Sequence, residues 1–187
     1  MVRIRPERPA DHAAIRAVIE SAFGTRSEAD LVDALRREAT PFVSLVAERD
    51  EEIVGHICFS PVTIGEQAQA PAFIGLAPMA VRPDLQRTGI GSRLVAAGLD
   101  ECRARAQRLV VVVGHAAYYP RFGFRPASIL GLTCEYDVPD DVFMALRLDD
   151  SPVPPGVVRY HRAFAAVEGE SGNSVGSPEP NAQGPER

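Results

Sequence analysis

The segment MAVRPDLQRTGIGSRLV, residues 79–95, decides how this chain is interpreted. An apolar run ends at Val81, and a polar loop with two glycines, Gly89 and Gly91, leads into a helical pattern. A glycine near a helix start costs roughly 1 kcal/mol relative to alanine, so its presence needs a reason. The first N–H groups of a helix lack intrahelical acceptors, and glycine lets an anion approach them closely. The loop therefore predicts a phosphate or pyrophosphate site, although a tight strand-to-helix connection explains the glycines alone equally well.

Pro78 lies inside the apolar segment GLAPMAV, residues 75–81, which leads into this loop. Proline removes a donor from the strand ladder and is normally confined to edges and bulges. A bulge here, or an early parting of the strand from its neighbour, leaves unpaired backbone groups beyond residue 78. Such groups can bind an extended, amide-containing ligand beside the pyrophosphate site. Coenzyme A is a pyrophosphate at one point and peptide-like beyond it, so it fits both features.

The remainder of the chain has the pattern of one α/β domain. Apolar periodicity and turn residues predict a strand, two helices, three strands, a helix from about Leu85 to Gln107, a strand, a short helix and two closing strands. This order favours a mixed sheet with helices on both faces. Residues 166–187 are rich in Gly, Ser, Pro and Glu, which predicts a disordered tail after a domain of residues 1–165.

Composition excludes several classes of protein. The 187 residues carry a net charge of −5, which disfavours non-specific nucleic-acid binding. The three cysteines lie far apart without zinc-type spacing, so we expect buried thiols, a reducing compartment and no metal. No apolar run approaches the ~20 residues that span a bilayer, and the charged N-terminus is unlike a signal peptide. We therefore expect a cytoplasmic protein without a membrane partner.

Two segments resemble motifs of the GNAT superfamily of acyl-CoA-dependent N-acyltransferases. The core of its motif A, Q/R-x-x-G-x-G/A, stands here as Gln86-Arg87-Thr88-Gly89-Ile90-Gly91. The segment YYPRFGF, residues 118–124, resembles the LYEKLGF-type segment that follows the fifth strand in that superfamily. The run from Arg3 to about Phe164 can be laid over the family, nearer to an uncharacterised bacterial branch. The resemblance implies a mixed, mostly antiparallel seven-stranded sheet, splayed between strands four and five, where acyl-CoA binds.

The resemblance also assigns cofactor contacts to particular residues. Backbone groups of Met79, Ala80 and Val81 would pair with the pantetheine arm, and one N–H there would polarise the thioester carbonyl. The pyrophosphate would bind backbone N–H groups of the loop, within a cofactor-binding set that comprises Gln86, Arg87, Thr88, Gly89, Ile90, Gly91 and Ser92.

The sequence specifies the general acid and the acceptor contacts less closely than the cofactor contacts. Tyr119 matches the family's tyrosine, four residues before Gly123, and as general acid would protonate the departing CoA thiolate; packing under the turn of residues 121–124 is its alternative role. Tyr118 is its competitor, and His115 is an alternative acid or pantetheine contact because Gly114-His115 replaces an asparagine frequent in the family. Glu28 begins the second helix in the region that lines the acceptor cleft of the family. We treat it as a hypothetical substrate contact, with favourable helix N-terminal charge as its alternative role.

The resemblance implies an N-acetyltransferase that uses acetyl-CoA as co-substrate and no metal. The acceptor would be a primary amine of a small molecule or protein, attacking directly in a ternary complex, since no cysteine stands in the motifs. The alternatives are a non-catalytic acyl-CoA sensor and a transferase of a different acyl group. Homodimers are common in the family, and this sequence contains no signature for or against one.

Overall fold

The computed structural model describes residues 1–65 and 72–165. Its main sheet has seven strands in the order β1-β2-β3-β5-β6-β9-β7, and a small sheet has the order β4-β10-β8. The strands are β1 (Val2–Pro6), β2 (Val43–Arg49), β3 (Glu52–Pro61), β4 (Thr63–Ile64), β5 (Phe73–Val81), β6 (Leu109–Val113), β7 (Arg125–Pro126), β8 (Leu132–Cys134), β9 (Phe143–Arg147) and β10 (Gly156–Arg159). The helices are α1 (His12–Phe23), α2 (Ser27–Glu38) and α3 (Ile90–Ala104).

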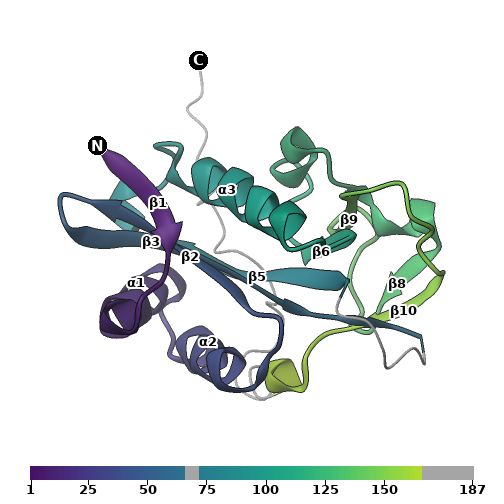
Figure 1. The fold of residues 1–187 in the computed structure, drawn as a ribbon, viewed down its shortest axis with the longest axis horizontal. Coiled ribbons are helices and arrows are strands. Elements are labelled where there is room, and N and C mark those ends of the chain that lie inside the picture. The colour runs from purple at the N-terminus through teal and green to yellow at the C-terminus, as the bar shows by residue number, and fades with distance from the viewer. Residues whose placement is uncertain (66–71, 166–187) are drawn as a thin grey trace.

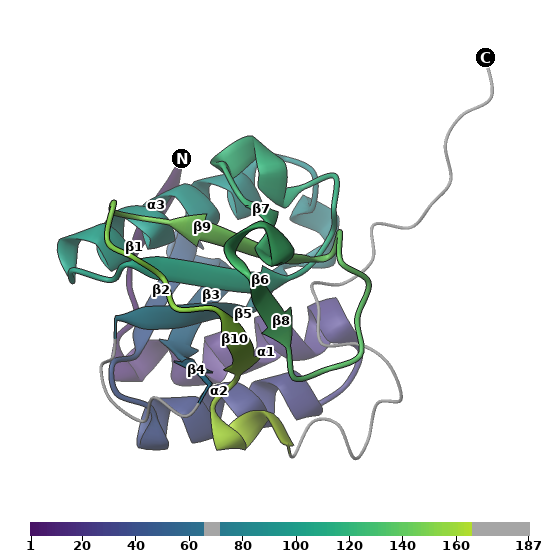
Figure 2. The same ribbon diagram turned by 90° about the vertical axis from the view of Figure 1, so that its right-hand side faces the viewer.

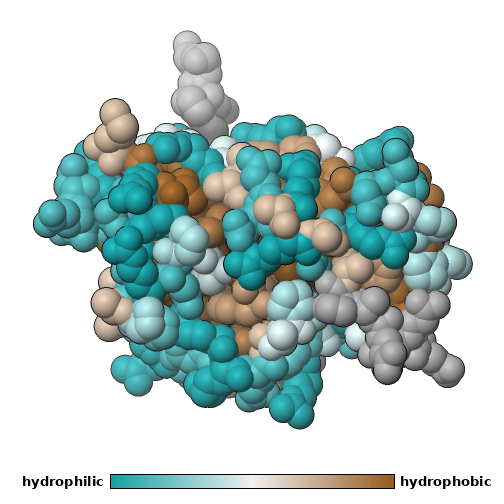
Figure 3. Space-filling view, in the orientation of Figure 1, coloured by the Kyte–Doolittle hydropathy of each residue, from teal (hydrophilic) through white to brown (hydrophobic). Residues whose placement is uncertain are grey.

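The main sheet lies between two helical layers. Figure 1 shows α3 on one face and α1 with α2 on the other, and Figure 2 shows the end of the molecule where β6, β9 and β7 lie. Each face carries its own apolar cluster, with Leu94 and Val95 on the α3 face and Ile15 and Leu35 on the α1/α2 face. Hydrophilic residues cover much of the surface in Figure 3, with smaller apolar groups between them. The predicted α/β fold, with a seven-stranded sheet and helices on both faces, is confirmed.

The central strands β5 and β6 part from each other, as the resemblance implied. Their parallel pairing runs only from Phe73 opposite Leu109 to Gly75 opposite Val111, whereas β5 continues to Val81. Every other pairing in the main sheet is antiparallel. We call the region beyond Gly75, where β5 has lost β6 as its neighbour, the split. It lies between the fourth and fifth strands of the sheet order.

A bulge accompanies the split. On β3, Ile57 is opposite Met79 and Phe59 is opposite Leu76, so one residue of β3 faces two of β5. These two residues are Ala77 and Pro78, joined by a cis peptide bond. The bulge predicted from Pro78 is therefore present.

The structure differs from the sequence prediction at the start of α3 and in the closing strand, and it adds three short strands, β4, β7 and β8, that were not predicted. Helix α3 begins at Ile90 rather than near Leu85, because Arg87 (φ 61°) and Gly89 (φ 90°) are left-handed and cannot continue a helix. The closing segment 156–164 does form a strand, β10, but this strand joins the small sheet and not the main one. The predicted tail of residues 166–187 lies outside the described residues.

Candidate functional site

The loop before α3 presents unpaired backbone donors. None of the N–H groups of residues 87–91 donates a hydrogen bond within the part of the chain that the structure describes. A Cβ placed on Gly89 would meet no atom within 4 Å, so the space beside the helix start is open. The first turn of α3 contains no acidic residue that would occupy these donors. Left-handed residues alternating with ordinary ones form a concave nest of N–H groups, which binds anions.

Gln86 departs from the predicted set. Its N–H donates to the carbonyl of Pro83 at 3.3 Å, and its side-chain amide donates to the carbonyl of Val81 at 3.2 Å. Thr88 similarly uses its hydroxyl to close the turn, onto the carbonyl of Leu85 at 2.6 Å. The free backbone donors therefore begin at Arg87, and Gln86 shapes the loop.

Tyr118 lies against the first turn of α3. Its hydroxyl is 3.5 Å from Ser92 Oγ and would be 3.0 Å from a Cβ on Gly91. The Met79 methyl group would lie 3.7 Å from the same Cβ, so β5 and the helix start meet at this tyrosine. Partial burial raises the pKa of Tyr118 above its usual value. Tyr118 is therefore placed next to the anion nest.

Tyr119 has a different position. Its ring is fully buried in the apolar cluster of the α3 face, and Phe124 packs edge-on at 5.6 Å between centroids. The ring also covers Gly114, where a Cβ would lie 2.3 Å from Tyr119 Cε2.

The edge of β5 that faces the split carries the other predicted cofactor contacts. Met79, Ala80 and Val81 pair with β3 on one side and, among the described residues, have no strand partner on the other. His115 follows β6 at the same end, and its Nε2 is buried without a partner in the described part of the chain. The structure thus brings the loop, the β5 edge and the segment after β6 together, as the two motifs predicted.

Glu28 lies in the first turn of α2 and is only 6% exposed. Thr25 donates a hydrogen bond to its carboxylate at 2.5 Å. The geometry is compatible with both roles considered from the sequence, a substrate contact or a favourable charge at the helix start.

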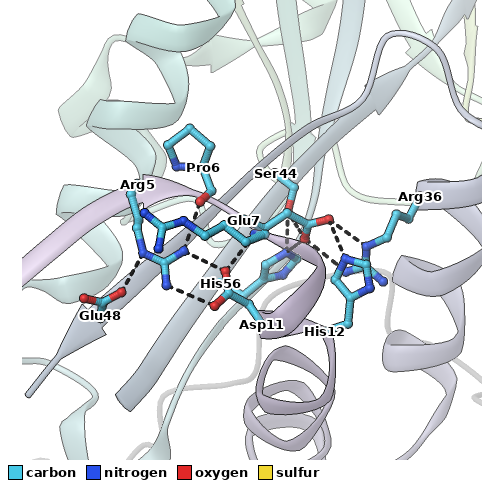
Figure 4. Close-up of polar contacts among 10 residues, drawn as sticks. Arg5, Pro6, Glu7, Asp11, His12, Arg36, Ser44, Glu48 and His56 are labelled. Carbon is cyan, nitrogen blue, oxygen red and sulfur yellow. Dashed lines mark hydrogen bonds and ion pairs between the residues drawn. The ribbon is translucent and has the colours of Figure 1, made fainter. Parts of the chain in front are cut away.

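A buried polar network behind β5 was not predicted. His56, directly opposite Ala80, is fully buried, and its Nε2 lies 2.8 Å from Ser44 Oγ (Figure 4). Ser44 donates to Glu7 at 2.5 Å, and Arg36 binds both oxygens of Glu7 at 2.6 and 3.0 Å. The members come from β3, β2, the segment after β1, and α2, so no local sequence pattern could have revealed the network.

Desolvation lowers the pKa of His56 and keeps its imidazole neutral. Burial alone would raise the pKa of Glu7, but hydrogen bonds from His56, Arg36 and Ser44 outweigh it and hold that pKa well below its usual range. The network therefore consists of a neutral histidine and a fully ionised carboxylate–guanidinium pair.

The described residues contain neither a cluster of metal ligands nor a membrane-spanning helix. Within residues 1–65 and 72–165, no three His, Cys, Asp or Glu side chains come together as metal ligands would. Over the same residues, no helix combines the length and the apolar character that a membrane span requires.

Comparison with known proteins agrees with the geometry. Residues 10–124 match the model of the acetyltransferase (GNAT) family. The chain is 40% identical to the uncharacterised N-acetyltransferase YjhQ of Escherichia coli K12 over 134 residues, 70% of this chain and 74% of YjhQ. It is 36% identical to the uncharacterised N-acetyltransferase YhbS of the same strain over 165 residues, 86% of this chain and 97% of YhbS.

Solved structures give the same result. The crystal structure of E. coli YhbS in complex with CoA has a TM-score of 0.81 at 34% identity, covering 88% of this chain and 92% of YhbS. A GNAT family acetyltransferase of Brucella melitensis in complex with acetyl-CoA has a TM-score of 0.74 at 39% identity, covering 88% of this chain and 98% of its own. The free amides of the loop, the split and these likenesses lead to one conclusion: the chain belongs to the GNAT family of acetyltransferases.

Proposed function

We propose that this protein transfers the acetyl group of acetyl-CoA to a primary amine by direct attack in a ternary complex. The observation that carries the proposal is the nest of unpaired N–H groups at residues 87–91, directly beside the unpaired edge of β5. Pyrophosphate would bind the nest, and the pantetheine amides would pair with Met79 and Val81 as a further strand would. The relatives crystallised with CoA and acetyl-CoA support this choice of ligand.

The thioester would lie in the split. A backbone N–H of β5 near Met79 would stabilise the negative charge that develops on the thioester oxygen, as an oxyanion hole does. The amine nitrogen forms a bond to the carbonyl carbon, the carbon–sulfur bond breaks, and the sulfur leaves as a thiolate. The amine releases its proton to solvent water.

Tyr119 is our proposed proton donor to that thiolate. Its ring lies against Gly114, the residue that follows β6, which supports a position beside the split. Tyr118 is the alternative, and its hydroxyl lies beside Gly91 and Ser92, close to the proposed pyrophosphate. A Tyr119→Phe variant would then lose turnover with nearly unchanged affinity for acetyl-CoA, whereas Tyr118→Phe would chiefly weaken that affinity. The reverse pattern would exchange the two assignments.

Titration calorimetry with acetyl-CoA tests the binding step, and thiol release in the presence of primary amines tests the transfer. A non-catalytic acyl-CoA sensor would give heat with acetyl-CoA and no amine-dependent thiol release. A transferase of another acyl group would give faster release with that acyl-CoA than with acetyl-CoA. An absence of binding to every acyl-CoA would refute the proposal.

A further inference from the structure

Two buried hydroxyl groups on the α1/α2 face belong to residues that flank Gly75. Ser60 is fully buried and Tyr160 is 8% exposed, and neither hydroxyl has a hydrogen-bond partner within the described residues. Ser60 is directly opposite Gly75, so its side chain points to the same face as a Cβ on Gly75 would. That Cβ would lie 2.8 Å from Tyr160 Cε1, so the tyrosine ring rests on the glycine. Both hydroxyls therefore flank one residue.

Gly75 is the last residue of β5 that pairs with β6. The two hydroxyls therefore stand where the split begins, on the face opposite to α3. Tyr119, our proposed acid, belongs to the apolar cluster of the α3 face. Cofactor loop and acid thus lie on one side of the split, and the unpartnered hydroxyls lie on the other.

An unpaired hydroxyl in the interior destabilises a protein, because it loses its hydrogen bonds to water without replacement. Such groups persist in native proteins where ordered water or a ligand supplies the missing partner. Burial raises the pKa of Tyr160 well above its usual value, so the phenol stays uncharged. Two uncharged hydroxyls suit a neutral amine better than an ammonium ion, and the neutral amine is the form that attacks a thioester.

An acidic loop borders the same place. Residues 135–141 contain four exposed carboxylates, of Glu135, Asp137, Asp140 and Asp141, and none forms an ion pair with a described residue. No lysine or arginine interrupts the chain between Arg125 and Arg147.

Both ends of this loop are fixed at the site. At its start, Glu135 accepts the backbone N–H of Tyr160 at 2.5 Å and Tyr136 stacks on the Tyr160 ring. Just after its end, the Val142 carbonyl accepts the N–H of Gly114, at the end of β6.

The structure assigns the acceptor subsite to the hydroxyls of Ser60 and Tyr160, entered past the acidic loop by a primary amine that carries a second positive charge. This assignment rests on the proposed transfer reaction and names the acceptor side of it. The loop carboxylates attract the protonated diamine and keep its distal ammonium. At the split, the two hydroxyl oxygens accept N–H groups of the deprotonated amine, so its lone pair stays free for the thioester carbon.

The test compares Tyr160→Phe and Ser60→Ala with Tyr136→Phe, which removes the same atom from the neighbouring ring. Thermal melting, acetyl-CoA affinity by calorimetry, and kcat/KM with putrescine and n-butylamine are measured for each. The two subsite variants should melt at or above the wild-type temperature, because no intramolecular hydrogen bond is lost. They should keep acetyl-CoA affinity and lose kcat/KM by about tenfold per hydroxyl, the value of one hydrogen bond.

The acidic loop is tested separately with Asp140→Asn/Asp141→Asn. The wild type should prefer putrescine to n-butylamine, and the preference should fall in this variant and at about 1 M salt, where the Debye length is about 3 Å. An unchanged preference would overturn the acidic-loop assignment.

The outcomes against the hydroxyl subsite are distinct from failure of the proposed function. Melting temperatures of Tyr160→Phe and Ser60→Ala below that of the wild type would show that the hydroxyls hold a structural partner, and would overturn the subsite even if neither amine is turned over. Loss of acetyl-CoA affinity in these variants would overturn it too. Failure of the wild type to bind acetyl-CoA would instead refute the transfer reaction itself.

Discussion

Replacing Gly114 by alanine should displace the Tyr119 ring and stop catalysis while cofactor binding survives. The new Cβ would lie 2.3 Å from Tyr119 Cε2 and 2.9 Å from Cδ2. Non-bonded carbon atoms prefer about 3.5–4.0 Å, so the ring must move by about 1.2 Å or more. Phe124 and Tyr118 pack edge-on against the ring, with centroids 5.6 and 5.1 Å away, and limit where it can go. A displacement of about 1 Å in a catalytic group can reduce the rate by about a hundredfold.

Gly98→Ala is the matched control for this change. Its Cβ would lie 2.5 Å from Phe59 Cε2 and Cζ, so it overpacks a buried ring of the same apolar cluster away from the acid. Both variants should lose about 1–3 kcal/mol of unfolding free energy, measured by urea denaturation. Only Gly114→Ala should lose kcat, and both should bind acetyl-CoA as the wild type does. Equal kcat in the two variants would refute the placement of Tyr119 at the reacting thioester.

Three other outcomes follow from the described contacts. Gly89→Ala should weaken acetyl-CoA binding measured by calorimetry. A φ of 90° costs an alanine about 1–2 kcal/mol, and a backbone that relaxed from this angle would no longer direct the N–H groups of the nest to one point. Unaltered affinity would count against the nest. The free energy of unfolding should fall as pH drops below about 6.5, because the folded pKa of His56 is lowered and the unfolded chain takes up the proton first; urea denaturation of His56→Gln should lack this step. Below about pH 4.5 a second loss should appear as Glu7 and Asp11, whose folded pKa values are depressed, are protonated on unfolding, and Glu7→Gln should reduce it.

The parts of the fold that the sequence could predict are those with a local physical signal. The run LVVVV became β6 within its predicted bounds, because a continuous β-branched stretch has few alternatives to a strand covered on both faces. Pro78 indicated the bulge, because proline removes a ladder donor wherever it stands. The strands β4, β7 and β8 have only two or three residues each and carry no measurable periodicity. Their placement depends on partners far along the chain.

The same limit applies to the site. The sequence could predict the loop because its donors and glycines are consecutive. It could not predict that Gln86 donates hydrogen bonds to the carbonyls of Val81 and Pro83, because the motif does not specify these contacts. The sequence could not decide whether Tyr118 or Tyr119 is the general acid, because adjacent residues on a short 3-10 turn point in different directions. In the structure, the Tyr119 ring covers Gly114 and the Tyr118 hydroxyl lies by Gly91. Ser60 and Tyr160 are 100 residues apart, and only the folded sheet shows that they flank one glycine.

Three sets of unsatisfied polar groups meet around the split: the N–H groups of residues 87–91, the free edge of β5, and the hydroxyls of Ser60 and Tyr160. The buried hydroxyls reduce the stability of the free protein, since an unpaired polar group in a poorly solvated place is unfavourable, whereas residues 87–89 are exposed to solvent. A bound acyl-CoA would satisfy the first two sets and leave the third exposed to the acceptor. Ligand bound at about 100 times its Kd stabilises a fold by about 2.7 kcal/mol. The cofactor should therefore bind first and build one wall of the acceptor site.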